Sequence, residues 1–265
     1  MVVLTAVILI VPIAGALWIK LQLERPAISR LNRLGAMVFY PAGLRNTPRW
    51  LIPIEKAIGE FAAFDRVSYV LLKGDHITDA DLAELASLSA EIDKLGIESS
   101  AITDAGLVHL KPLKNLQVLN IGSDNITDAG LMHLNPLKKL EYLTLRSSQI
   151  TGQGLAHVAD LPLLNILDLG TPNLEDAGLQ NLRGVDLSHL DISGAGVSDA
   201  GLTPLESMKG LERLNVAGTR VTSVGMDALI ERFPNIEIRV LKWQPNARPG
   251  SGLYTPETHR RGAPD

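Results

Sequence analysis

The sequence is dominated by one motif that recurs at a nearly constant spacing. Ile-Thr-Asp-Ala-Gly-Leu begins at Ile102 and recurs intact at Ile126. Degenerate copies begin at Ile77, Ile150, Leu174, Val197 and Val221. The successive spacings are 25, 24, 24, 24, 23 and 24 residues. Self-similarity at such a period indicates a repeat architecture, in which each unit buries its apolar face only by stacking on its neighbours.

A second pattern, Leu-x-x-Leu-x-Leu, lies between the copies and predicts a strand in each repeat. In the best copy Leu119 and Ile121 alternate with Asn120, so two side chains point inward and the one between them points outward. Aliphatic side chains must fill the core, because 46% of the residues are hydrophobic and only 4% are aromatic. Stacked repeats would align these strands as a parallel sheet.

The motif itself predicts a short helix after each strand. Thr103 is a plausible N-cap, because its hydroxyl can accept a hydrogen bond from a free amide of the first turn. Asp104 follows where the positive end of the helix dipole favours a carboxylate. Gly106 is small enough for close approach, and Leu107 and Leu110 point into the core.

On these two patterns the chain resembles the leucine-rich-repeat family over about residues 61 to 243. The resemblance implies an α/β solenoid, a right-handed βα horseshoe with its parallel sheet on the concave face. The apolar N-terminal segment and the repeats of Ile-Thr-Asp-Ala-Gly-Leu type look like those of bacterial membrane-anchored repeat proteins. The repeats are also similar to those of F-box proteins, which are substrate-recognition adaptors, but no F-box is identifiable in residues 25–64.

The N-terminal segment predicts an association with a membrane. Val2 to Ile19 is apolar except for Thr5, and an 18-residue helix covers about 27 Å, close to the thickness of a bilayer core. Ala14 to Ala16 reads as a cleavage site, so a signal peptide and an exported body are the alternative. The absence of a basic residue before the segment favours a retained single-pass anchor, and the basic residues after it favour a cytoplasmic body.

Four segments follow from these patterns. Residues 1–24 are the anchor or signal segment, and 25–64 are an N-terminal cap with a short strand expected at Met37 to Tyr40. Residues 65–243 are the repeat domain of seven to eight repeats. Residues 244–265 are rich in Pro and Gly without periodicity, so a disordered tail is expected.

One irregularity predicts a local change in packing. The third position after the last strand leucine carries a residue that can bond the turn backbone in five repeats, but Pro172 and Ala195 cannot do so. The spacing between the motif copies at Leu174 and Val197 is also 23 residues, shorter than the others. A kink or looser packing is therefore expected across residues 170–197, visible as uneven hydrogen exchange.

Composition and motifs exclude several classes of site. A net charge of −4 gives no general attraction to nucleic acid, and the absence of cysteine removes thiolate metal sites. His109, His133 and His157 recur at one repeat position, but the distance between neighbouring helices is too large for a shared metal ion. No cofactor and no metal are expected.

The outward strand positions are the candidate binding surface. They include tyrosine and arginine, the usual anchors of protein interfaces. The set is Tyr69, Lys73, Lys94, Glu98, Asn120, Tyr142, Thr144, Arg146, Asp168, His189, Asp191, Arg213 and Asn215.

This set predicts a non-enzymatic scaffold that binds another protein from a membrane anchor. Asp168, His189 and Asp191 could form a carboxylate–imidazole pair, but no nucleophile or oxyanion donor set accompanies them. The alternatives are a substrate-recognition adaptor and a structural envelope protein, in which the outward positions are merely solvated sheet surface.

Overall fold

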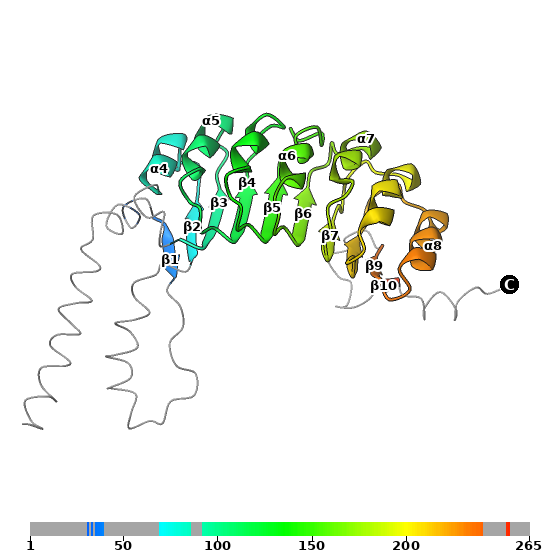
Figure 1. The fold of residues 1–265 in the computed structure, drawn as a ribbon. Coiled ribbons are helices and arrows are strands. Elements are labelled where there is room, and N and C mark those ends of the chain that lie inside the picture. The colour runs from blue at the N-terminus through cyan, green and yellow to red at the C-terminus, as the bar shows by residue number, and fades with distance from the viewer. Residues whose placement is uncertain are drawn as a thin grey trace, which may run out of the picture.

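The repeats stack into one curved sheet flanked by short helices. A computed structural model describes residues 31, 33, 35–39, 69–85, 92–240 and 253–254. Within these residues ten strands form a single sheet in chain order, with β2 to β9 parallel and β1 and β10 antiparallel at its two edges. Figure 1 shows the strands on the concave side of an arch and the helices on its convex side.

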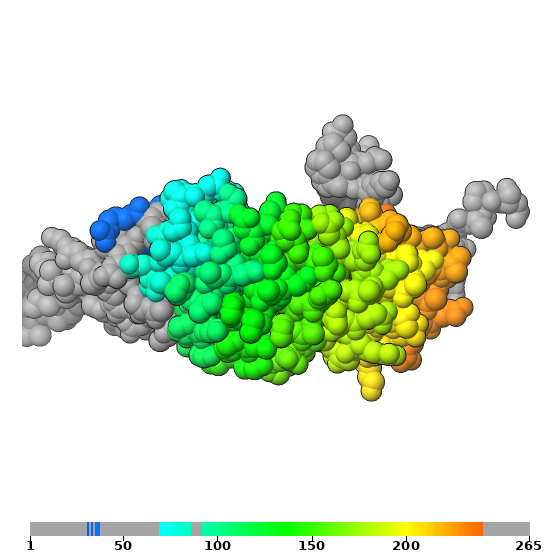
Figure 2. Space-filling model, turned by 90° about the horizontal axis from the view of Figure 1, so that it is seen from above, coloured from blue at the N-terminus to red at the C-terminus, as the bar shows by residue number. Residues whose placement is uncertain are grey.

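The strands are β1 (Met37–Phe39), β2 (Tyr69–Lys73), β3 (Lys94–Glu98), β4 (Val118–Gly122), β5 (Tyr142–Arg146), β6 (Ile166–Gly170), β7 (His189–Asp191), β8 (Arg213–Asn215), β9 (Glu237–Arg239) and β10 (Leu253–Tyr254). The α-helices are α4 (Asp79–Glu84), α5 (Asp104–Leu107), α6 (Leu155–Ala159), α7 (Asp176–Leu179) and α8 (Ser223–Arg232). The 3-10 helices are η2 (Val108–Leu110), η3 (Gly130–Leu134), η4 (Gln180–Leu182) and η5 (Asp199–Ser207). Seen from the helical side in Figure 2, successive repeats form consecutive bands along an elongated body.

The core lies between the sheet and the helices, as the leucine pattern predicts. Leu119 and Ile121 of β4 are 0% and 2% exposed, whereas Asn120 between them is half-buried on the concave side. Leu107 and Leu110 are fully buried from the helical side. Each such side chain contributes about 1.5–3 kcal/mol when it leaves water, so the aliphatic stack supplies most of the stabilisation.

The aspartate of the motif links each repeat to the next. Asp104 Oδ1 accepts from the backbone N–H of Thr127 at 2.9 Å, and its Oδ2 accepts from the Thr127 hydroxyl at 2.6 Å. We call this arrangement the aspartate clasp. Thr103 also caps α5 as expected, accepting from the amide of Ala105 at 3.2 Å. The same clasp joins Asp79 to Thr103, Asp176 to Ser198 and Asp199 to Thr222. The clasp of Asp128 with Thr151 differs in that its Oδ2 accepts both bonds. Bonding between repeats is thus a role of the aspartate that the helix-dipole argument does not include.

A buried hydroxyl makes a second link between repeats. Ser99 donates to the carbonyl of Ile77, Ser123 to that of Ile102 and Ser147 to that of Ile126, at 2.6–2.7 Å. At the equivalent position of the next repeat, Thr171 is fully buried and its hydroxyl has no partner among the described residues. The link therefore stops between β5 and β6.

The clasp is missing at the same junction. The aspartate position is taken by Gly152 and the threonine position by Glu175. In their place Gly152, at a φ of 104°, packs against Gly178 so closely that a Cβ on either would overlap the opposite repeat. Asn181 Nδ2 donates to the Gly152 carbonyl at 2.9 Å. The β5–β6 junction thus depends on close backbone packing and backbone pairing.

The sheet narrows just beyond this junction. β5 and β6 pair over five positions, whereas β6 and β7 pair over three and end at Asp168 opposite Asp191. This change falls inside 170–197, where the sequence predicts an irregularity. The core stays closed there, because Leu190, Ile192 and Ala195 are at most 3% exposed. The irregularity is a loss of sheet pairing without exposure of the core.

The flanks are described only in part. β1 lies within the strand predicted at 37–40, and Leu31 of the cap is buried. β10 lies within residues 244–265, where the sequence predicts a disordered tail, and its Leu253 and Tyr254 pair with the edge strand β9. The rest of 244–265, the predicted anchor Val2–Ile19 and most of the cap lie outside the described residues. Among the helices that the structure describes, none has the length and apolar character needed to cross a bilayer.

Candidate functional site

The parallel register places the outward side chains in rows that run across the strands. The upper row aligns Val118, Tyr142, Ile166, His189, Arg213 and Glu237. The middle row aligns Gly96, Asn120, Thr144, Asp168, Asp191, Asn215 and Arg239. Neighbours in a row sit on strands about 4.8 Å apart, so each row is a continuous line of side chains.

The predicted residues differ in how much they contact one another. At the N-terminal end Lys73 Nζ and Glu98 Oε2 form an exposed ion pair at 2.6 Å, and Tyr69 is half-buried. Lys94 is exposed at the start of β3. Thr144 is only 5% exposed, so most of its surface is covered, although it lies in the middle row.

The acidic part of the middle row is a partly buried charged site. Asp168 has a side chain 26% exposed, and Arg146 Nη2 lies 3.9 Å from its Oδ2. Burial raises the pKa of Asp168, the Asp191 carboxylate raises it further, and Arg146 opposes the shift. Asp191 Oδ1 accepts from the backbone N–H of Ser193 at 2.8 Å, and its Oδ2 accepts from Asn215 Nδ2 at 2.7 Å.

The carboxylate–imidazole pair that the sequence allows is not formed. His189 lies in the upper row, opposite Ile166 and Arg213, while both aspartates lie in the middle row. Its Nδ1 lies 2.6 Å from the hydroxyl of Ser188, the preceding residue. The structure thus brings Asp168 and Asp191 together and leaves the imidazole in a different contact.

Two further residues belong to this surface. Glu237 and Arg239 are the outward positions of β9, which follow from the alternation around the buried Ile238. Glu237 receives Arg213 Nε at 3.3 Å and Arg239 Nε at 3.9 Å, on its two carboxylate oxygens. Applying the strand rule to the final strand would have found both of them.

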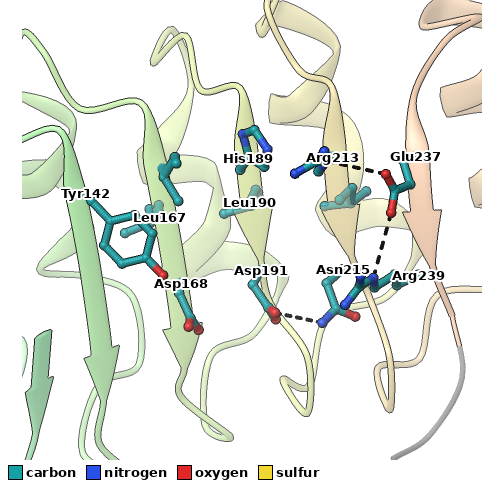
Figure 3. Close-up of a pocket in the computed structure, with 12 residues that line it drawn as sticks. Tyr142, Leu167, Asp168, His189, Leu190, Asp191, Arg213, Asn215, Glu237 and Arg239 are labelled. Atoms are coloured by element: carbon teal, nitrogen blue, oxygen red, sulfur yellow. Dashed lines mark hydrogen bonds and ion pairs between the residues drawn. The ribbon is translucent and has the colours of Figure 1, made fainter. Parts of the chain in front are cut away.

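A shallow hollow of about 220 Å³ lies over β5 to β9. It is lined by Tyr142, Asp168, His189, Asp191, Arg213, Asn215 and their neighbours. Figure 3 shows the Tyr142 ring extending from β5 toward β6, with its hydroxyl on the side of Asp168. The volume is below the range of about 300–1,000 Å³ typical of small-molecule pockets, so the hollow suits a few side chains of a larger partner.

The histidine series lies on the opposite, helical side. His109, His133 and His157 are all half-buried, and burial lowers the pKa of His133. His157 Nδ1 lies 3.5 Å from Asn135 Nδ2. Throughout the described segments, no group of three or more His, Cys, Asp or Glu side chains is arranged to hold a metal ion.

One family model and two solved structures are similar to parts of the chain. A family model described as "Leucine Rich repeat" matches residues 186–205. An internalin (inlF) from Listeria monocytogenes is 23% identical, with a TM-score of 0.46 over 65% of this chain and 46% of that one. Internalin C2 from the same organism is 21% identical, with a TM-score of 0.47 over 66% of this chain and 71% of that one. This chain thus spans less than half the length of the first internalin.

No curated protein matches the chain. The matched segment, 186–205, contains β7 and most of η5, the same order of strand and helical turn that the structure repeats from β2 onward. Residues 186–205 thus resemble a leucine-rich repeat, and the other described repeats share their order of strand and helical turn.

Proposed function

We propose that the protein is a non-enzymatic scaffold that binds another protein through the concave sheet and is held at a membrane by Val2–Ile19. The observation that carries this proposal is the alignment of the outward side chains in register across eight parallel strands. These side chains project from a rigid sheet whose opposite face is fully packed. Less conformational freedom is lost on association when the binding groups are already ordered.

The residue types of the C-terminal half support a protein partner. Tyr142 offers a large rigid surface, and Arg146 and Arg213 have side chains 66% and 63% exposed. Tyrosine and arginine supply most of the binding energy at many protein interfaces. The small volume of the hollow also favours side chains of a partner over a cofactor-sized ligand.

The test is site-specific photo-crosslinking in native membranes. A benzophenone amino acid at Tyr142 places the reactive group on the concave face, and the same group at Met132 places it on the helical side, where that side chain is 51% exposed. A protein adduct from position 142 and none from position 132 is expected. Equal adducts from the two positions would contradict binding through the concave face.

A double variant supplies the matched loss-of-function test. Tyr142→Ala with Arg146→Ala removes two outward side chains and is expected to abolish the adduct formed from a benzophenone at Arg213. The circular dichroism melt should stay nearly unchanged, since neither side chain is part of the aliphatic core. An undiminished adduct would show that binding does not depend on Tyr142 and Arg146.

Membrane attachment has its own test. The apolar run Val2–Ile19 supports a single-pass anchor, and Lys20, Arg25, Arg30 and Arg33 after it support a cytoplasmic body. The full chain should stay in the pellet after alkaline carbonate extraction, and a chain without residues 1–24 should not. Protease added to intact cells should leave the body uncut; digestion would place the body outside.

A further inference from the structure

The middle row of the concave face contains a run of polar side chains on four consecutive strands. Asn120, Thr144, Asp168 and Asp191 are aligned opposite one another in register. Strand spacing places their Cα atoms about 4.8 Å apart. Apolar core residues lie directly beneath them, so any hydrogen bonds that these side chains need must come from the row itself or from above it.

Two polar groups in this row have no hydrogen-bond partner among the described residues. Asn120 Oδ1 is buried and has no hydrogen-bond partner in the described part of the chain. Thr144 is only 5% exposed, and its hydroxyl makes no hydrogen bond to another described residue. A covered polar group without a partner is destabilising. These two neighbours therefore supply hydrogen-bonding capacity that a ligand lying over the row could use.

Among the described residues, the carboxylates beside them also lack a close cation. Asp168 has only the loose contact with Arg146, at 3.9 Å. Asp191 is bonded by neutral donors, the Asn215 amide and a backbone N–H. The two arginines at the C-terminal end both point to Glu237, as the dashed lines in Figure 3 show. The residues that the structure describes therefore compensate the negative charge of the row only weakly.

We propose that Asp168, Asp191, Thr144 and Asn120, with the ring of Tyr142 beside them, bind an arginine or lysine side chain of the partner protein. This inference rests on the proposed function and names the chemistry of its partner. A guanidinium carries five N–H donors in a planar fork that matches a carboxylate, and an aromatic ring attracts cations to its face. The unpaired oxygens of Asn120 and Thr144 would accept from the remaining N–H groups.

The pKa of Asp168 is consistent with this assignment. It is raised by burial and by Asp191, which is the behaviour of a carboxylate without a sufficient counter-charge. A bound cation would favour the ionised form, so its binding should lower the pKa of this group. A calcium ion fits less well, because it needs six to eight oxygens within about 2.6 Å, and the row spreads its oxygens over four strands.

The experiment uses the full chain in detergent micelles and fluorescent peptides in which glycine alternates with arginine, glutamine or glutamate. Anisotropy should show saturable binding of the arginine peptide, at least about tenfold tighter than that of the glutamine peptide. Asp168→Asn should weaken the arginine peptide about tenfold or more. Asp160→Asn, the loss of an exposed carboxylate elsewhere, should leave its affinity unchanged.

Three results would overturn the inference. They are equal binding of the arginine and glutamine peptides, preferred binding of the glutamate peptide, and displacement of the arginine peptide by calcium at a concentration below that of the peptide. Photo-crosslinking from Tyr142 separates this inference from the proposed function. If the adduct persists undiminished in Asp168→Asn, the concave face binds a partner without this cation site. If no adduct forms in any variant, the proposed function fails as well.

Discussion

Single residues on this solenoid have roles that depend on the neighbouring repeat. Asp104 is bonded to the backbone and hydroxyl of Thr127, a residue 23 positions later. Thr127 in turn accepts from the amide of Ala129 and so caps its own helical turn. One carboxylate therefore connects two repeats and orients the cap of the second. Charge-assisted bonds of this kind contribute about 1.5–3 kcal/mol each to stability.

Whereas the Asp104 carboxylate stabilises the fold, the Asp168 carboxylate destabilises it, so its replacement should stabilise the protein. Its pKa is raised from the ordinary value of 3.8 because burial and the Asp191 carboxylate disfavour the charge, while Arg146 compensates only in part. A carboxyl group with a higher pKa in the folded state destabilises the fold once it is ionised. Asp168→Asn should therefore raise the melting temperature at neutral pH, measured by circular dichroism.

The pH dependence distinguishes this cause from a packing effect. The penalty is complete above the raised pKa and absent below 3.8, where the carboxyl is protonated in both states. The gain of Asp168→Asn should therefore disappear as the pH falls through that interval. Asp160→Asn, at an exposed position, should produce no comparable gain at any pH. A gain that is constant with pH would show that charge is not its origin.

At the scale of elements, the effect of replacing a glycine by alanine depends on the atoms that lie beside it. A Cβ on Gly106 in α5 would overlap Asp79 Oδ1, which is held by the backbone and hydroxyl of Thr103. Gly106→Ala must displace that carboxylate and break the clasp, so it should reduce the free energy of unfolding by about 1–3 kcal/mol. Urea unfolding followed by circular dichroism measures the change.

Gly122 in β4 is the matched control for that substitution. The atom nearest to a Cβ at this position is the Ile97 carbonyl oxygen, 3.9 Å away, which is an ordinary contact. Gly122→Ala should be neutral or stabilise the strand by up to about 0.5–1 kcal/mol, because alanine has less freedom to lose on folding. Equal destabilisation by the two alanines would show that the aspartate contact is not the reason for the glycine.

The elements were largely predictable from sequence, whereas the contacts between them were less so. The period of the leucines identifies the strands and buried positions because stacking leaves few other places for an aliphatic side chain. The clasp could have been inferred from the recurrence of Asp and Thr at the same period, but its geometry depends on how far the chain rises in each repeat. The burial of Thr144 and the separation of His189 from Asp168 depend on neighbouring side chains, which a strand pattern does not specify.

At the scale of the whole molecule, stability is a sum over junctions between neighbouring repeats. The junctions from β2 to β5 each have an aspartate clasp and a buried serine bond. The β5–β6 junction has neither, and the sheet narrows at the next one. The strands from β7 to β9 are also only three residues long. The C-terminal repeats should therefore unfold before the N-terminal ones.

Hydrogen exchange measured by mass spectrometry at increasing urea tests this order. Peptides from 189–239 should lose protection at lower urea than peptides from 94–146, with the boundary between β5 and β6.

Thr171→Val replaces the unpartnered buried hydroxyl at that boundary by a methyl group of similar shape. The change should stabilise the junction by about 1–3 kcal/mol and bring the two unfolding transitions closer together. Ser147→Ala removes the hydrogen bond to the Ile126 carbonyl and should therefore destabilise its junction. Loss of protection at one urea concentration throughout the chain would mean that backbone pairing alone couples the repeats, and that neither the clasp nor the hydroxyl link sets where the solenoid divides.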